Sequence, residues 1–254
     1  RAVGERLEIV HAAESINMDE SPVTAVRKKK RCSINVCMDL VKSGQAQAMV
    51  SAGNSGAVTA AAVFNLGRVP GVLRPAIATV MPTRQPNRPL LLLDAGANTD
   101  CDEKWLAQFA VMGSTYSRYV LKRTEPVVGL LSIGTEDCKG NEMTKKAFSL
   151  IQKTGVKFRG NVEGHDLFLG KTDVVVCDGF VGNVVLKTTE SVAHAVGYWM
   201  KREFFRHPVR MFGALLLKGA LETLKHRMDP EIYGGAPLLG VPGTVIITHG
   251  SSTY

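Results

Sequence analysis

The chain has 254 residues, of which 45% are hydrophobic and 21% charged, and this ordinary composition excludes both a disordered chain and a bundle of membrane-spanning helices. No apolar stretch reaches the roughly 18 residues of a membrane-spanning helix, so we expect a cytoplasmic protein with a single domain over residues 1–254. The net charge of +8 predicts long-range attraction to an acidic partner, for which nucleic acid, an anionic membrane, phosphate and an acidic carrier protein are the candidates.

The predicted elements alternate between strands and helices along most of the chain. Strands are predicted over residues 6–10, 49–50, 76–80, 90–93, 127–131, 174–177 and 245–248. Helices are predicted to begin at Pro22 and to cover residues 34–41, 57–66, 103–121, 142–153, 183–206 and 209–226. The alternation predicts βαβ units with right-handed crossovers, and hence an α/β fold with a mostly parallel sheet. Residues 70–89 carry five prolines and are the nearest approach to a linker, but they need not separate domains.

Five of the apolar runs stop at a small, glycine-rich polar turn. The turns cover residues 51–56, 95–98, 133–135, 179–183 and 249–252. Strands of this kind are buried on both faces in parallel sheets, and the loops that follow them gather at the edge where α/β proteins bind ligands. The backbone N–H groups of a helix that starts at such a loop bind anions. A single glycine turn could serve only to reverse the chain, but five of them favour a shared anion site.

The common nucleotide-binding loops and nucleophile motifs do not occur in the sequence. No segment fits G-x-G-x-x-G or G-x-S-x-G, and residues 164–172 have one residue too many for a P-loop and precede a strand instead of following one. Cys177 lies in an apolar run, so we expect it to be buried and not to be a nucleophile. His249 directly ends a strand, a position at which histidine is more often structural than catalytic.

The cysteine spacing gives neither a metal nor a disulfide signature. The five cysteines form no C-x-x-C pair, and their odd number argues against a disulfide framework. We therefore expect buried reduced thiols, no metal and no cofactor. The densest basic cluster, residues 27–31, has no interleaved aromatic residue to stack on bases, which favours a solvated helix face over a nucleic-acid site.

The helix predicted over residues 209–226 is strongly amphipathic. Its apolar stripe includes Phe212, Leu216, Leu217 and Leu221, and basic residues flank it. Two interpretations stay open at this point. Either the stripe packs in the core or at a dimer interface, or the helix and its predecessor form a hairpin that rests on a membrane surface.

Seven short motifs, spread over nearly the whole chain, together resemble those of one known family. They are N-M-D-E-S-P at residues 17–22, V-S-A-G-N-S-G-A at 50–57, L-L-D-A-G-A-N at 92–98, K-G-N-E at 139–142, G-N-V-E-G at 160–164, C-D-G-F-V-G-N at 177–183 and Y-G-G-A-P-L-L-G at 233–240. In this order they resemble the PlsX family of phosphate acyltransferases. Ser55 stands where the family usually has threonine. The family's N-terminal strand with its Asp-Ala-Met-Gly-Gly-Asp motif, and its last helix, are missing, so we expect a sequence truncated at both ends.

The resemblance implies transfer of a fatty acyl group from acyl carrier protein to inorganic phosphate, which forms acyl phosphate for bacterial phospholipid synthesis. It also implies a cytosolic homodimer that associates peripherally with the membrane, with the downstream glycerol-3-phosphate acyltransferase as a further partner and no nucleic acid. The implied fold is a three-layer α/β/α sandwich similar to phosphotransacetylases and to isocitrate and isopropylmalate dehydrogenases, with a protruding amphipathic helical hairpin at about residues 183–226.

This chemistry needs no catalytic triad, because inorganic phosphate is already an anionic nucleophile and a thiolate is a good leaving group. The protein is expected to place phosphate beside the thioester and to stabilise the oxyanion. The residues expected to bind phosphate or substrate are Gly53, Asn54, Ser55, Gly56, Asn98, Asn141 and Gly182. The residues expected to be catalytic are Asn183, Lys187, His249, Ser251 and Asp178, the last by orienting neighbouring donors.

Three other functions stay in view. A phosphotransacetylase acting on acyl-coenzyme A would use the same turns, and a non-catalytic membrane-docking scaffold would use only the amphipathic hairpin. A dehydrogenase is suggested by fold kinship alone, and the sequence lacks the carboxylate cluster that would hold its substrate-bound metal. A phosphate-dependent release of thiol that prefers acyl-coenzyme A would indicate the phosphotransacetylase. No phosphate-dependent release of thiol would indicate the scaffold.

Overall fold

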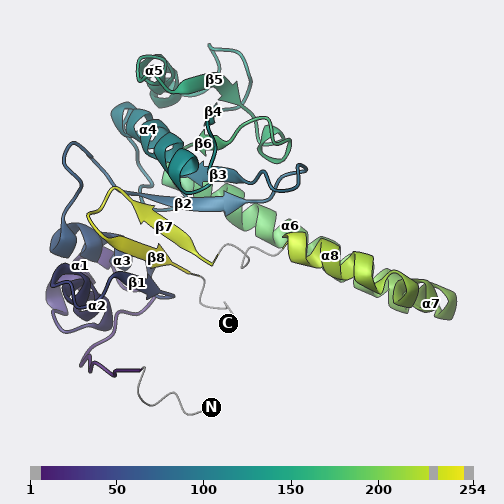
Figure 1. Ribbon diagram of the computed structural model, residues 1–254, viewed down its shortest axis with the longest axis horizontal. Helices are drawn as coiled ribbons and strands as arrows, with labels where there is room; N and C mark the ends of the chain where they lie inside the picture. The colour runs from purple at the N-terminus through teal and green to yellow at the C-terminus, as the bar shows by residue number, and fades with distance from the viewer. Residues whose placement is uncertain (1–6, 229–233, 249–254) are drawn as a thin grey trace. The chain divides into compact units, whose positions relative to one another are not determined.

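A computed structural model describes residues 7–228 and 234–248 of the chain. By their contacts these residues form two compact units, whose elements are labelled in Figure 1. The first unit comprises residues 7–75 and 240–248, and the second comprises residues 76–228 and 234–239. The boundary after Pro75 therefore falls inside the proline-rich segment, residues 70–89.

The first unit is built around a pair of parallel strands. It contains α1 (Pro22–Lys28), α2 (Ser33–Lys42), β1 (Ala48–Ser51), α3 (Ser55–Ala61), a π-helical turn η1 (Ala62–Leu66) and β8 (Thr244–Ile247). β1 and β8 pair in parallel, from Ala48 opposite Thr244 to Ser51 opposite Ile247. Pro22 opens α1 as predicted, because a proline at the first helical position loses no helical hydrogen bond.

Residues 7–10, where the sequence predicted a strand, form no regular element. The side chains of Leu7 and Ile9 are 63% and 87% exposed. The alternating pattern there is a strand signal without a partner, since no described strand pairs with this segment. The prediction of a strand at residues 6–10 is therefore wrong for its described part.

The second unit is a mixed sheet with helices on both faces. Its strands are β2 (Ala76–Met81), β3 (Leu90–Leu93), β4 (Val127–Leu131), β5 (Lys157–Val162), β6 (Val174–Val176) and β7 (Ala236–Leu239), in the order β7-β2-β3-β6-β4-β5. Its helices are α4 (Glu103–Tyr119), α5 (Glu142–Ile151), the short η2 (Asp166–Phe168), α6 (Gly179–Phe205), α7 (Pro208–Leu216) and α8 (Lys218–Met228). β3, β6, β4 and β5 run parallel, and β2 is antiparallel to β3 and β7. The α/β class and the mostly parallel sheet are thus confirmed.

β3 explains why a run of four leucines forms a strand. All four side chains of Leu90–Leu93 are fully buried. Leu91 and Leu93 belong to a core cluster with residues of α4 and α5, whereas Leu90 and Leu92 belong to a second cluster with Leu167. Because alternate side chains of a strand point to opposite faces, an unbroken apolar run is what a strand covered on both faces requires.

Two strands of the second unit have weak sequence signals, and the sequence analysis did not predict them. β5 begins with Lys157 and contains Arg159 and Gly160, and its first four residues alternate between exposed and half-buried. β7 contains Pro237, which has no N–H to donate to a neighbouring strand. Their strand conformation depends on pairing with β4 and β2, which is a tertiary interaction.

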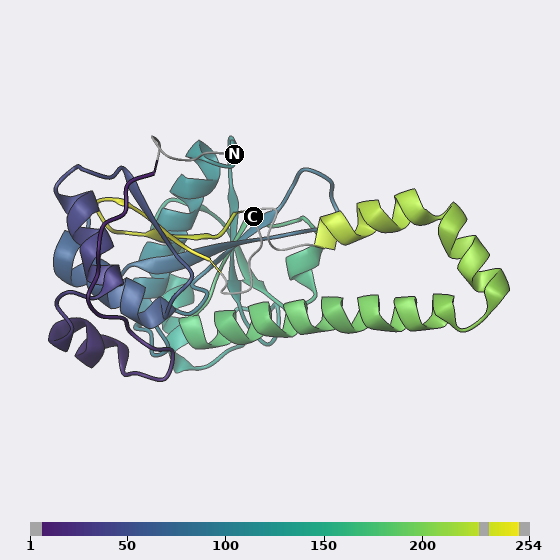
Figure 2. The same ribbon diagram turned by 90° about the horizontal axis from the view of Figure 1, so that it is seen from below.

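The helices α6 to α8 form the hairpin expected near residues 183–226, with two differences in its bounds. α6 begins at Gly179, because the carboxylate of Asp178 caps its first turn, and not at residue 183. The second predicted helix is divided at Leu217 into α7 and α8. Figure 2 shows α6 running away from the sheet of its unit, α7 turning at the far end and α8 returning.

The apolar residues of α7 are exposed to solvent. α7 has no buried residue, and the side chains of Phe212, Leu216 and Leu217 are 63%, 72% and 52% exposed, while Leu221 of α8 is half-buried. Packing of this stripe in the core of the chain, one of the interpretations of the sequence, is therefore wrong. Among the described helices, none combines the length and the hydropathy needed to cross a membrane.

Gly113 of α4 allows this helix to lie directly on β6, and its replacement by alanine should destabilise the protein. A Cβ atom at Gly113 would lie 2.6 Å from Cγ1 of Val174. We expect a net loss of about 1 kcal/mol and a fall in Tm of roughly 2–4 °C, since overpacking outweighs the better helix propensity of alanine.

Thermal unfolding followed by circular dichroism tests this expectation. The matched control is Gly197→Ala in α6, where a Cβ atom would meet nothing within 4 Å, so that Tm should stay or rise. Equal effects of the two substitutions would contradict the assigned contact.

Candidate anion-binding site

The first turn of α6 lies against the loop that follows β3. The amide of Gly179 donates to the carbonyl oxygen of Asn98 at 2.6 Å. A Cβ atom at Gly179 would lie 2.6 Å from that oxygen, and one at Gly182 would overlap the carbonyl group of Asp94. Glycine is therefore required at both positions, because only a residue without a Cβ atom lets the helix approach so closely. We call residues 94–98 together with residues 178–183 the β3–α6 junction.

The loop 94–98 is held by the carboxylate of Asp94, which is fully buried. Oδ1 accepts hydrogen bonds from the amides of Ile77 at 2.9 Å and Ala97 at 3.0 Å. Oδ2 accepts from the amide of Asn98 at 2.7 Å and from its side-chain Nδ2 at 2.9 Å. Burial raises the pKa of Asp94, and the four N–H donors act in the opposite direction. Asp94 is not among the site residues expected from the sequence.

The β3–α6 junction brings together four of the residues expected in the site. Asn98 and Asn183 lie on its two sides, with a Cβ atom at Gly96 placed 3.7 Å from Cβ of Asn183. Gly182 is buried against Asp94, and Asp178 accepts from the amide of Val181 at 2.9 Å. The amides of Gly179 and Val181 are already bonded to Asn98 and Asp178, so it is the partial positive charge of the helix N-terminus that suits this arrangement to an anion.

Lys187 lies one turn further along α6 than Asn183, on the same face of the helix. Its Nζ is 2.9 Å from Oε2 of Glu190, and its side chain is 48% exposed. In this arrangement the charge of Lys187 is shared with Glu190 and is not directed at the β3–α6 junction alone.

The four expected residues of the first unit lie where α3 begins, with Gly53 and Asn54 in the turn after β1 and Ser55 and Gly56 in the first turn of the helix. Asn54 is 8% exposed and caps α3, because its Oδ1 accepts from the amide of Ala57 at 3.0 Å. Its Nδ2 donates to carbonyl oxygens of the loop at residues 17–20, at 3.3 to 3.5 Å. Gly53, Ser55 and Gly56 flank it, and a Cβ atom at Gly56 would lie 2.8 Å from Cγ of Pro22. The side chain of Asn54 therefore holds two segments of its unit together.

The remaining expected residues lie elsewhere. Asn141 caps α5, and its Oδ1 accepts from the amide of Thr144 at 2.8 Å. His249 and Ser251 lie outside the described residues.

Two thiols near the β3–α6 junction are not suited to nucleophilic attack. Cys177 is buried, as predicted, and burial raises its pKa well above the ordinary value. Burial also raises the pKa of Cys101 to about 12, and the nearby carboxylate of Asp94 adds to the effect. Because the thiolate is the nucleophilic form, burial disfavours nucleophilic attack by either cysteine.

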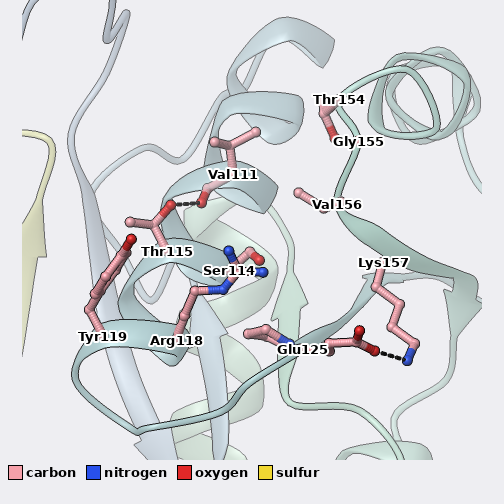
Figure 3. Close-up of a pocket in the computed structure, with 11 residues that line it drawn as sticks. Val111, Ser114, Thr115, Arg118, Tyr119, Glu125, Thr154, Gly155, Val156 and Lys157 are labelled. Atoms are coloured by element: carbon pink, nitrogen blue, oxygen red, sulfur yellow. Dashed lines mark hydrogen bonds and ion pairs between the residues drawn. The ribbon is translucent and has the colours of Figure 1, made fainter.

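A surface pocket of about 670 Å³ lies at the opposite edge of the sheet, near the N-terminal ends of β4 and β5 (Figure 3). Lys157 and Glu125 form an ion pair of 2.8 Å there, and Thr115 donates to the carbonyl oxygen of Val111 within α4. Elsewhere in the described chain, Glu163, His165 and Asp166 place one ligand atom each within 4.8 Å of the others. All three belong to one partly exposed turn, in which the amide of Glu163 donates to Asp166.

The fold is that of the phosphotransacetylases. The chain superposes on a phosphotransacetylase from Streptococcus pyogenes with a TM-score of 0.56 and 18% identity, covering 92% of this chain and 70% of the other. For the EutD phosphotransacetylase from Staphylococcus aureus the TM-score is 0.52 and the identity 17%, covering 87% of this chain and 62% of the other. Identities this low support the fold alone.

Sequence comparison assigns the family. Residues 2–254 match the family model described as "Fatty acid synthesis protein". The chain is 52% identical to a phosphate acyltransferase from Nostoc sp. (strain PCC 7120), over 98% of this chain and 73% of that protein. It is also 52% identical to one from Desulforamulus reducens, over 98% of this chain and 74% of that protein. The chain therefore belongs to the PlsX family of phosphate acyltransferases and is an enzyme.

Proposed function

We propose that the enzyme moves a fatty acyl group from acyl carrier protein to inorganic phosphate, forming acyl phosphate for phospholipid synthesis. Membership of the phosphate acyltransferase family supports acyl transfer to phosphate. The close contact of the loop 94–98 with the first turn of α6 is the observation that carries the proposed phosphate site. It brings the loop that contains Asn98 to the start of a helix of 27 residues, whose fifth residue is Asn183.

In the proposed reaction, an oxygen of phosphate attacks the thioester carbonyl carbon and gives a tetrahedral oxyanion. The C–S bond then breaks, and the carrier leaves as a thiolate that needs little protonation. The side-chain amides of Asn98 and Asn183, beside the positive end of α6, are the donors we assign to phosphate and the oxyanion. Asp178 keeps the first turn of α6 in place by accepting from the amide of Val181. No step in this scheme requires a cofactor.

The other expected residues enter the proposal on their sequence motifs. Lys187 supplies positive charge once it exchanges Glu190 for substrate. In the first unit, Gly53, Asn54, Ser55 and Gly56 stay in the proposal on their motif alone, because the side chain of Asn54 is already bonded within its own unit. Asn141, as a substrate-binding residue, and His249 and Ser251, as catalytic residues, are also part of the proposal.

We also propose that the protein is a homodimer and associates peripherally with the membrane. The exposed apolar side chains of α7 support contact with an apolar phase or with a second protein. The membrane is our assignment for Phe212, Leu216, Leu217 and Leu221, and a dimer interface is the alternative. The net charge of +8 suits an acidic carrier protein as acyl donor.

The choice of acyl donor tests the function directly. Thiol release from acyl carrier protein should require inorganic phosphate and exceed release from acyl-coenzyme A. Release should weaken as ionic strength rises, because salt screens the attraction between a basic enzyme and an acidic carrier. A preference for acyl-coenzyme A would indicate a phosphotransacetylase, and no phosphate-dependent release from either donor would contradict the proposal.

Asn183→Ala should lower the turnover rate in this assay by roughly a hundredfold, the typical effect of losing one oxyanion donor. The matched control is Thr188→Ala, an exposed position of the same helix, which should keep the wild-type rate. Wild-type turnover of the Asn183 variant would remove this residue from the proposed site.

Leu216→Glu should weaken sedimentation of the protein with anionic liposomes and leave its oligomeric state unchanged. A charge at this position opposes insertion of α7 into the apolar layer of the membrane. Thr223→Glu, which adds the same charge at an exposed position of α8, is the control and should change liposome binding less. Dissociation of a dimer by Leu216→Glu, measured by light scattering, would instead assign α7 to an interface.

A further inference from the structure

We propose that Asp94 is the positioning residue of the phosphate site: its buried carboxylate sets the place of Asn98 relative to the first turn of α6. This inference rests on the proposed function of the β3–α6 junction. Asp94 is fully buried and reaches no reacting atom, so it acts only through the groups that it binds.

The carboxylate joins three segments of the second unit. Through Ile77 it binds β2, through its own backbone it ends β3, and through Ala97 and Asn98 it shapes the loop that follows. The backbone repeats the first link, since the amide of Ala95 donates to the carbonyl oxygen of Ile77 at 3.0 Å. The loop therefore has one fixed conformation, in which both ends of Asn98, its amide and its side chain, are bonded to Oδ2 of Asp94.

The backbone of Asp94 also locates α6. Its amide donates to the carbonyl oxygen of Cys177 at 3.1 Å, immediately before the residue that caps α6. Its carbonyl group lies where a Cβ atom at Gly182 would stand, and it accepts from Sγ of Cys177 at 3.5 Å. The same residue thus contacts the helix with its main chain and the loop with its side chain, so it determines the spacing between Asn98 and Asn183.

A carboxylate is specifically required at this position. Each of its two oxygens accepts two N–H groups, and a carboxylate carries no N–H group that would oppose these donors. An asparagine has the same shape but only one acceptor oxygen, and its NH2 group would face two of the four donors. Asp94→Asn therefore preserves the packing and removes the hydrogen bonds that hold one side of the loop.

The matched control is Asp173→Asn. Asp173 is also buried, at 1% exposure, and it precedes β6 at the opposite edge of the sheet. It accepts from the amide of Val127 at 3.0 Å and pairs with Arg88 at 3.0 and 3.2 Å. Both substitutions remove a buried negative charge from the same unit, but only Asp94→Asn changes the β3–α6 junction.

Steady-state thiol release, with inorganic phosphate as the varied substrate, gives the first readout. We expect Asp94→Asn to raise the KM for phosphate at least tenfold and to change kcat less, whereas Asp173→Asn should lower Tm and leave the KM for phosphate within twofold. An unchanged KM in a folded Asp94→Asn protein, or the same rise in both variants, would overturn the proposal.

A second readout does not depend on activity. Inorganic phosphate should raise the Tm of the wild type and of Asp173→Asn, because a ligand that binds the folded state stabilises it, and should not raise that of Asp94→Asn. A wild type that lacks turnover but shows this pattern would refute the proposed function and leave the role of Asp94 standing. If phosphate leaves the Tm of the wild-type protein unchanged, the inference is overturned.

If Asp94→Asn does not fold, Gly96→Ala replaces it. Gly96 has a φ of +126°, which alanine adopts only with strain, so this change displaces the loop without touching the core. It should raise the KM for phosphate in the same way, and an unchanged KM would overturn the proposal.

Discussion

The absence of side chains at Gly179 and Gly182 is the constraint on which the β3–α6 junction depends. It brings the first turn of α6 into backbone contact with the loop after β3, at the C-terminal ends of two neighbouring parallel strands. The loop that contains Asn98 and the start of the helix that contains Asn183 then meet, although the two residues are far apart in the sequence. Any larger residue at either glycine would separate the helix from the loop and divide the proposed anion site.

Much of the fold follows from local patterns, and the exceptions have tertiary causes. The apolar run of β3 is predictable because only a strand covered on both faces needs it. β5 could not be predicted in this way, since its polar first half becomes a strand by pairing with β4. Residues 7–10 show the reverse case, in which an alternating pattern has no partner strand among the described residues.

The sequence predicted which turns meet better than it predicted the contacts of each residue. The glycine-rich turns at residues 95–98 and 179–183 meet as expected, because C-terminal ends of parallel strands share one edge. The capping bonds of Asn54 and Asn141 could not be read from composition, since the same side chain can bind a ligand or a helix end. Asp94 had a usable signal: an aspartate at a strand end, followed within four residues by glycine and asparagine, is typical of a side chain that bonds its own loop.

α6 begins at the β3–α6 junction and runs unbroken to Phe205, and α7 with its exposed apolar residues follows from Pro208. Its 27 residues correspond to a rod of about 40 Å, at 1.5 Å per residue. The length of α6 therefore fixes the distance between its N-terminus and whatever surface or protein binds α7. Insertion or deletion of whole helical turns in α6 would change this distance in steps of about 5.4 Å while keeping both ends in the same rotational register.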